Sequence, residues 1–216
     1  SGSLIPEVRV WYNPEMKTRN YMVPGILGLI LMISTISLMS MAVVREREIG
    51  TLEQLIVTPI KNYQLILGKL IPFTFIGFVV LIIVMVIMTQ WFGIVVRGNK
   101  LFLLFTALLF VLSNLGIGLF ISTVSKTQQQ AMMASVFAVM MPMIYLSGFA
   151  FPIENMPQVV QYITYIIPLR YFITILRGIV LKGIGFSALW VETLILFAMG
   201  MSLLIFSSLR FSKKID

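Results

Sequence analysis

The chain contains no cysteine and no histidine among its 216 residues. Without thiolates and imidazoles it has no disulfide, no cysteine nucleophile, no imidazole base and almost none of the ligands that transition metals prefer. Charged residues are also scarce, at 11% of the composition, which is too few for the polar surface of a soluble protein of this size. These absences argue against covalent or metal catalysis and against a water-soluble fold.

Hydrophobic residues make up 59% of the chain, and the mean hydropathy is +1.00. About 20 apolar residues in a helix cross a hydrocarbon core roughly 30 Å thick. Five segments meet that length, and Glu192 in the fifth is the only charged residue inside any of them. The sequence therefore predicts an all-α integral membrane protein with spans at 21–44, 72–96, 101–125, 128–151 and 186–209.

A further apolar stretch, 159–181, lies between the fourth and fifth spans, but it has Pro168 and Arg170 at its middle and Arg177 seven residues later. An arginine at the centre of a span costs about 2.5–3.5 kcal/mol even on insertion-based scales. We therefore predict two short helices that dip into the membrane or lie on its outer face, and no sixth span.

The net charge is +8, which anionic lipid headgroups explain more simply than nucleic acid does. Five spans place the chain ends on opposite sides of the membrane. The sixteen basic residues then divide eight to eight, so charge counting alone does not orient the chain. Residues 1–20 are expected to be a remnant of an extracytoplasmic segment, with Ser1-Gly2-Ser3 as a linker or expression scar and an earlier span missing.

The segment between the first two spans, from Arg45 to Pro59, differs in composition from the rest of the chain. Its five charged residues lie within its first nine positions, and apolar residues recur at helical spacing. Thr58-Pro59 then breaks the helix before a second short helix at 60–69. The residues alone leave two interpretations open: an amphipathic helix that joins two spans at the interface, or an element that binds a partner protein.

This segment resembles the cytoplasmic coupling segment of permeases in the type-2 ABC exporter family, multidrug-type branch. In that family a basic-acidic cluster, Gly-Thr, a Glu and Thr-Pro recur in this order. The resemblance covers the chain from about Val10 to its end and matches the last five spans. It is also carried by Trp11-Tyr12-Asn13-Pro14, Asn20-Tyr21-Met22-Val23-Pro24-Gly25, Leu146-Ser147-Gly148, Phe151-Pro152, Met156-Pro157 and Pro168-Leu169-Arg170-Tyr171.

The resemblance implies a permease subunit in a bacterial cytoplasmic (inner) membrane that exports a drug-like molecule, a lipid or a glycan. The chain has no Gly-x-x-x-x-Gly-Lys-Ser/Thr phosphate loop. ATP and magnesium would therefore belong to a separate ATPase chain, and a second permease, identical or different, would complete the complex. The residues expected to contact the ATPase are Arg45, Glu46, Arg47, Glu48, Gly50, Thr51, Glu53, Thr58 and Pro59.

Two polar residues inside spans are candidates for a transport pathway. Asn114 lies near the middle of the third span beside Gly116 and Gly118, where it lines a pathway or forms an interhelical hydrogen bond with close glycine packing. Glu192 is either an interfacial carboxylate that reaches water or part of an export site for a cationic substrate. An ATP-independent channel or secondary transporter is the alternative function. Such transporters often have charges at the membrane centre and paired broken helices, and the sequence shows neither feature.

Overall fold

The computed structural model describes residues 18–50 and 62–213, and most of these residues are helical. Five segments within them are long and apolar enough to cross a membrane, in agreement with the sequence prediction. The first segments are α1 (Thr18–Glu48), α3 (Asn62–Val86) with the π-helical turn η1 (Ile87–Trp91), and α4 (Lys100–Val124). The fourth consists of α5 (Gln128–Met133), the π-helical η2 (Ala134–Met140) and α6 (Met141–Leu146), and the fifth is α9 (Phe186–Lys213).

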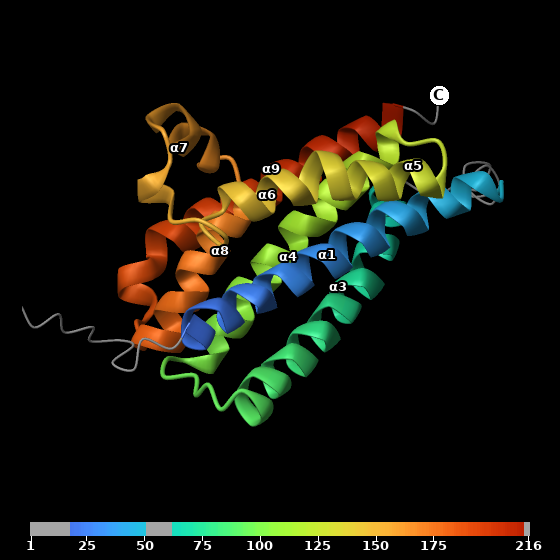
Figure 1. Cartoon of the computed structure of the whole chain (residues 1–216). Helices are drawn as coiled ribbons and strands as arrows, with labels where there is room; N and C mark the ends of the chain where they lie inside the picture. The colour runs from blue at the N-terminus through green and yellow to red at the C-terminus, as the bar shows by residue number, and fades with distance from the viewer. Residues whose placement is uncertain (1–17, 51–61, 214–216) are drawn as a thin grey trace, which may run out of the picture.

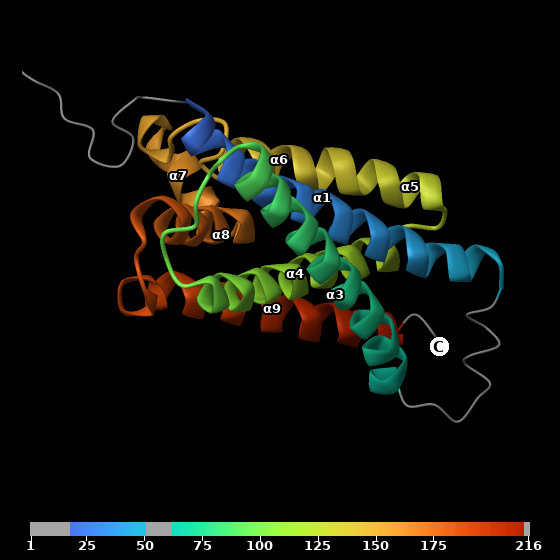
Figure 2. The same ribbon diagram turned by 90° about the horizontal axis from the view of Figure 1, so that it is seen from below.

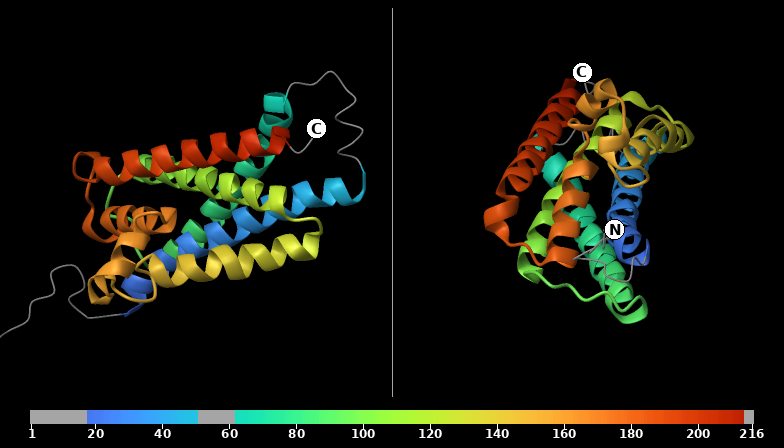
Figure 3. Two further views of the ribbon diagram at one scale, coloured as in Figure 1. Left: turned by 90° about the horizontal axis from the view of Figure 1, so that it is seen from above. Right: turned by 60° about the vertical axis from the view of Figure 1, so that its left-hand side comes forward.

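The spans run side by side, so that α1 begins and α9 ends at opposite ends of the bundle (Figure 1). We call the end where α1 and α9 terminate the α1-exit end, and the other the α1-entry end. Turned views show α4 in the interior of the bundle, with α1, α3 and α9 around it (Figures 2 and 3). Consistent with this position, α4 contacts all three of these helices and is the most buried of the spans.

Small residues let α4 approach its neighbours closely. A methyl group added to Gly118 would lie 2.8 Å from the Met39 side chain and 2.9 Å from the Ile36 carbonyl oxygen of α1. A methyl group added to Gly116 would lie 3.1 Å from Leu203 of α9. The close glycine packing predicted beside Asn114 is therefore confirmed, and it serves two helix interfaces.

Both ends of the second span and the end of the fourth span are displaced, and each displacement has a local backbone cause. The second helix does not start at Pro72, because α3 runs through this proline from Asn62, so the separate helix predicted at 60–69 is continuous with the span where described. That span ends at Trp91, not at 96, and Gly93 follows with a positive φ of 64°. The fourth span ends at Leu146, and Gly148 follows with a φ of 79°.

The predicted helical pair is present as α7 (Gln158–Thr164) and α8 (Pro168–Arg177), which are preceded by the 3₁₀ turn η3 (Ile153–Asn155) and followed by the π-helical η4 (Gly178–Lys182). The pair is bent by 84°. Because α6 ends and α9 begins at the same end of the bundle, the pair enters and returns without crossing (Figure 1). Within the described residues, this geometry agrees with the prediction that the pair is not a span.

Of the two short helices, α8 enters the bundle instead of lying on its outer face. Leu169, Phe172, Ile175 and Leu176 are fully buried against α1, α4 and α9. The ring of Phe172 stacks on Phe110 of α4 at a centroid distance of 4.2 Å. This burial is expected of a re-entrant helix, whose backbone is shielded from lipid by the surrounding protein.

Candidate functional site

The charged cluster predicted to begin the coupling segment is the last turn of α1. The helix continues through Glu48, four residues past the predicted end of the span, and the Ile49 amide still donates to the Arg45 carbonyl at 3.0 Å. Gly50 then takes a left-handed φ of 77° and ends the helix. Successive side chains in a helix point about 100° apart, so neighbouring residues in this turn reach different helices.

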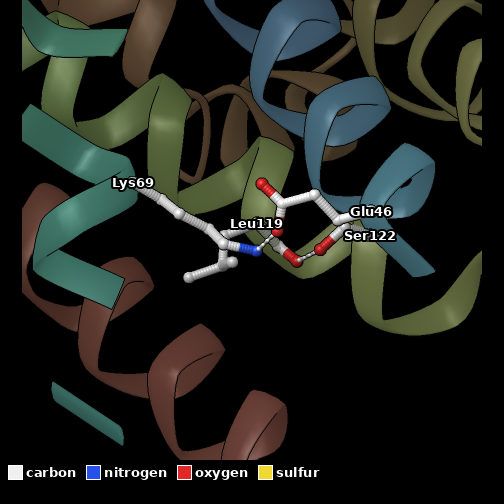
Figure 4. Close-up of polar contacts among 4 residues, drawn as sticks. All are labelled: Glu46, Lys69, Leu119 and Ser122. Atoms are coloured by element: carbon white, nitrogen blue, oxygen red, sulfur yellow. Dashed lines mark hydrogen bonds and ion pairs between the residues drawn. The ribbon is translucent and has the colours of Figure 1, made fainter. Parts of the chain in front are cut away.

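Glu46 forms an ion pair with Lys69 of α3. The Lys69 side chain is 9% exposed and that of Glu46 is 36% exposed. Figure 4 shows the lysine extending from α3 toward Glu46 over Leu119 and Ser122 of α4, where the Ser122 hydroxyl donates to the Leu119 carbonyl at 2.6 Å. The pair joins α1 to α3, and the carboxylate offsets part of the cost of burying the cation.

Arg47 contacts the last turn of α4. Its Nη1 atom donates to the carbonyl oxygens of Ser122 at 3.2 Å and Ser125 at 3.1 Å. The final carbonyl groups of a helix have no partners within the helix, and a guanidinium group at that end also interacts favourably with the helix dipole. Arg47 therefore ties the end of α1 to the end of α4.

Glu48 contacts the first turn of α5. Its carboxylate accepts hydrogen bonds from the Gln128 backbone amide at 3.0 Å and from the Gln128 Nε2 atom at 2.6 Å. A carboxylate at a helix N-terminus satisfies an unpaired amide and complements the helix dipole. Three consecutive residues, Glu46, Arg47 and Glu48, thus connect α1 to α3, α4 and α5, and we call them the exit-end clamp.

The remaining residues predicted to contact an ATPase are not part of the clamp. Arg45 is exposed beside the clamp. Thr51, Glu53, Thr58 and Pro59 lie outside the described residues. That these residues contact an ATPase stays a prediction. The contacts of the clamp within the chain could not be predicted from the sequence, because they join positions about 20 to 80 residues apart.

Asn114 is fully buried inside the subunit, so it does not line its surface. Neither its Oδ1 nor its Nδ2 atom forms a hydrogen bond within the described part of the chain. The interhelical bonds lie elsewhere: Ser207 of α9 donates to the Gly116 carbonyl at 2.8 Å, and the hydroxyls of Ser40 and Ser135 are 3.0 Å apart. The predicted Asn114 hydrogen bond is therefore not found, although polar bonds between spans are.

Glu192 is half-buried on α9, and its Oε2 atom is covered and forms no hydrogen bond with any described residue. The two arginines of the predicted helical pair lie on α8. Arg177 stacks over the Tyr21 ring at 3.6 Å and donates to the Tyr21 hydroxyl at 2.8 Å and the Gly148 carbonyl at 3.2 Å. Arg170 bonds to the Thr164 hydroxyl and lies 3.9 Å from the Tyr165 ring centroid.

Five apolar spans and a re-entrant helical pair among the described residues are the architecture of a multi-pass helical membrane protein. The chain belongs to the ABC-2 type transporter family, which it matches over residues 7–181. This agrees with the resemblance seen in the sequence, including the branch, since similar proteins carry multidrug permease names.

Three relatives from Escherichia coli strain K12 illustrate the similarity. The Probable multidrug ABC transporter permease YbhS is 37% identical over 210 residues, which cover 97% of this chain and 56% of the relative. The Probable multidrug ABC transporter permease YbhR is 39% identical over 183 residues, or 85% of this chain and 50% of the relative. The Inner membrane transport permease YhhJ is 31% identical over 213 residues, or 97% and 56%. The chain thus spans about half the length of the curated relatives it matches.

Proposed function

We propose that the protein is the membrane-spanning part of a permease subunit in an ATP-driven exporter of a bacterial inner membrane. A separate ATPase chain would bind ATP and magnesium, and two permease subunits would form the complex within the lipid bilayer. Family membership and the names of the relatives support this proposal. The substrate would be a drug-like molecule, a lipid or a glycan.

The contacts of the exit-end clamp support a mechanism by which the ATPase would move the spans. The segment expected to bind the ATPase begins in the last turn of α1, and this turn is bonded to the neighbouring spans through Glu46, Arg47 and Glu48. Movement of that segment during nucleotide-driven closure would be passed at once to α3, α4 and α5. Force applied to the ATPase-binding segment would thereby change the tilt of several spans.

The ATPase partner can be tested by co-expressing the full-length permease with a candidate ATPase. We expect a stable complex whose hydrolysis rate rises when a transported compound is added. Glu53→Gln should weaken the association or uncouple hydrolysis from the compound. A chain that never co-purifies with an ATPase, yet transports in its absence, would overturn the proposal.

Orientation can be tested separately, because a chain without cysteine accepts single reporter cysteines without background labelling. In this proposal the α1-exit end faces the cytoplasm. A cysteine in place of exposed Arg45 should react with an impermeant maleimide only in inside-out vesicles. A cysteine in place of Val95, which is 73% exposed at the opposite end, should react only in right-side-out vesicles.

A further inference from the structure

An apolar cleft of about 340 Å³ opens between the fourth span and α9. Ile117 of α4 and Leu203 of α9 form part of its wall, opposite Val139 of η2 and Met143 of α6. The bend between α7 and α8 bounds it through Ile166 and Pro168. The volume falls within the roughly 300–1,000 Å³ that is typical of ligand sites.

The cleft lies at the depth of the lipid tails. Ile117 is seven residues from the end of its span and Leu203 is seven residues from the end of its own, or ~10 Å at 1.5 Å per residue. Val139 is eleven residues from the start of its span, or ~16 Å on the same scale. A molecule that entered the cleft from the side would come from the hydrocarbon of the bilayer.

The wall formed by η2 is a π-helical segment, and π-helical turns inside α-helices are frequent at functional sites. One side of η2 is fixed to α1 by the bond between Ser135 and Ser40. Ala138 and Val139, on the same wide turn, line the cleft. The wall is thereby anchored on its inner side, and it presents small aliphatic side chains to the opening.

Arg170 lies beside the bend that bounds the cleft, and the described residues that line the cleft are all uncharged. Arg170 contacts Thr164 and Tyr165, which lie in the chain between the cleft residues Ile163 and Ile166. One of its donor atoms, Nη1, is used in the bond to Thr164. An arginine within a membrane-embedded segment is costly and marks a functional site by default. Its charge complements an anionic group carried at the end of an apolar chain.

We propose that this cleft binds one alkyl chain of an anionic amphiphile, with the acidic head at Arg170 and the chain against Val139, Met143 and Leu203. The amphiphile is either a resident membrane lipid or, if the exporter function proposed above holds, a transported molecule. Both sources share the same chemistry, and binding itself does not depend on the ATPase.

The test is photo-cross-linking in phosphatidylcholine nanodiscs with a palmitate probe that carries a diazirine in mid-chain. We expect labelled residues on η2, α6 and α9 around the cleft. Ala138→Phe, which fills the cleft, should reduce this labelling several-fold. Ala198→Phe is the matched control, because Ala198 is also an exposed alanine of a span but does not line the cleft.

The head group is tested with a probe of the same chain length that ends in trimethylammonium, which should label the cleft several-fold less than the palmitate probe. Equal labelling by the two probes, or unchanged labelling in a folded Ala138→Phe variant, overturns the proposal. Loss of the label during ATP turnover with the ATPase present would identify a transported molecule, and persistence would identify a resident lipid. Since labelling without ATPase already decides binding, its failure is distinguishable from failure of the exporter proposal.

Discussion

Glu46 of α1 and Lys69 of α3 form an ion pair whose two members are unequally covered, with the cation buried and the carboxylate partly open. Removing the carboxylate takes a counter-charge away from a buried ammonium group, which is unfavourable. We expect Glu46→Gln to lower the free energy of unfolding by about 2 kcal/mol. Lys69→Met should cost at most about 1 kcal/mol, because methionine keeps the apolar volume and the carboxylate can reach water.

Thermal or denaturant unfolding of the purified protein in one detergent measures both changes. The double variant should recover most of the stability lost in Glu46→Gln, since the buried charge of Lys69 is removed as well. Equal losses in the two single variants, or losses that simply add in the double variant, would contradict the asymmetry of burial.

Replacement by alanine should change the stability of the protein in opposite directions at two helical glycines. Gly118→Ala places a methyl group against Met39 and the backbone of Ile36, and a crowded backbone contact cannot move aside, so we expect a loss of about 1–3 kcal/mol. Gly68 is also inside a helix, but an added methyl group meets no atom of the described residues within 4 Å. Gly68→Ala should therefore stabilise the protein by about 0.5–1 kcal/mol, because alanine favours the helix.

The same unfolding measurement tests both glycine variants. An alanine that is tolerated equally at the two positions would show that α4 and α1 are not packed as closely as the structure places them.

Apolar length and the positions of charge and proline were sufficient to predict the spans and the helical pair, because a hydrocarbon core imposes a nearly fixed length on each crossing helix and excludes charge. Span boundaries were less predictable, since they depend on single backbone conformations. Gly93 and Gly148 end helices by adopting positive φ, while Pro72 lies within a continuous helix. Nothing in the local sequence distinguishes these roles.

The candidate site could be predicted only in part. The cluster from Arg45 to Glu48 was recognisable by its composition, but its contacts with Lys69, the end of α4 and Gln128 are long-range pairs. No local pattern determines such pairs. Asn114 shows the opposite case: its chemistry suggested an interhelical bond, whereas Ser207 and the Ser40–Ser135 pair supply the polar contacts observed.

Tyr21 should stabilise the re-entrant helix through both its ring and its hydroxyl. The hydroxyl accepts a hydrogen bond from Arg177 and the ring stacks under the guanidinium group. Tyr21→Phe keeps the ring and should cost about 1 kcal/mol, whereas Tyr21→Leu loses both contacts and should cost about 2 kcal/mol. Unfolding in detergent gives both values, and identical stabilities of the Phe and Leu variants would rule out a contribution from the ring.

Arg45 and Arg47 provide a matched pair for the proposed coupling, because they lie two residues apart on one helix turn and differ in their contacts. Arg45 is exposed, whereas Arg47 is bonded to the end of α4. Arg45→Ala should weaken association with the ATPase, since its charge is available to a partner protein. Arg47→Ala should weaken association less than Arg45→Ala does but reduce the stimulation of hydrolysis by a transported compound, since force on the segment would no longer reach α4. Co-purification and ATPase assays on the full-length complex separate the two effects.

If Arg47→Ala abolished association while Arg45→Ala changed neither association nor hydrolysis, Arg47 would be a docking residue, and the clamp would have no separate role in transmission.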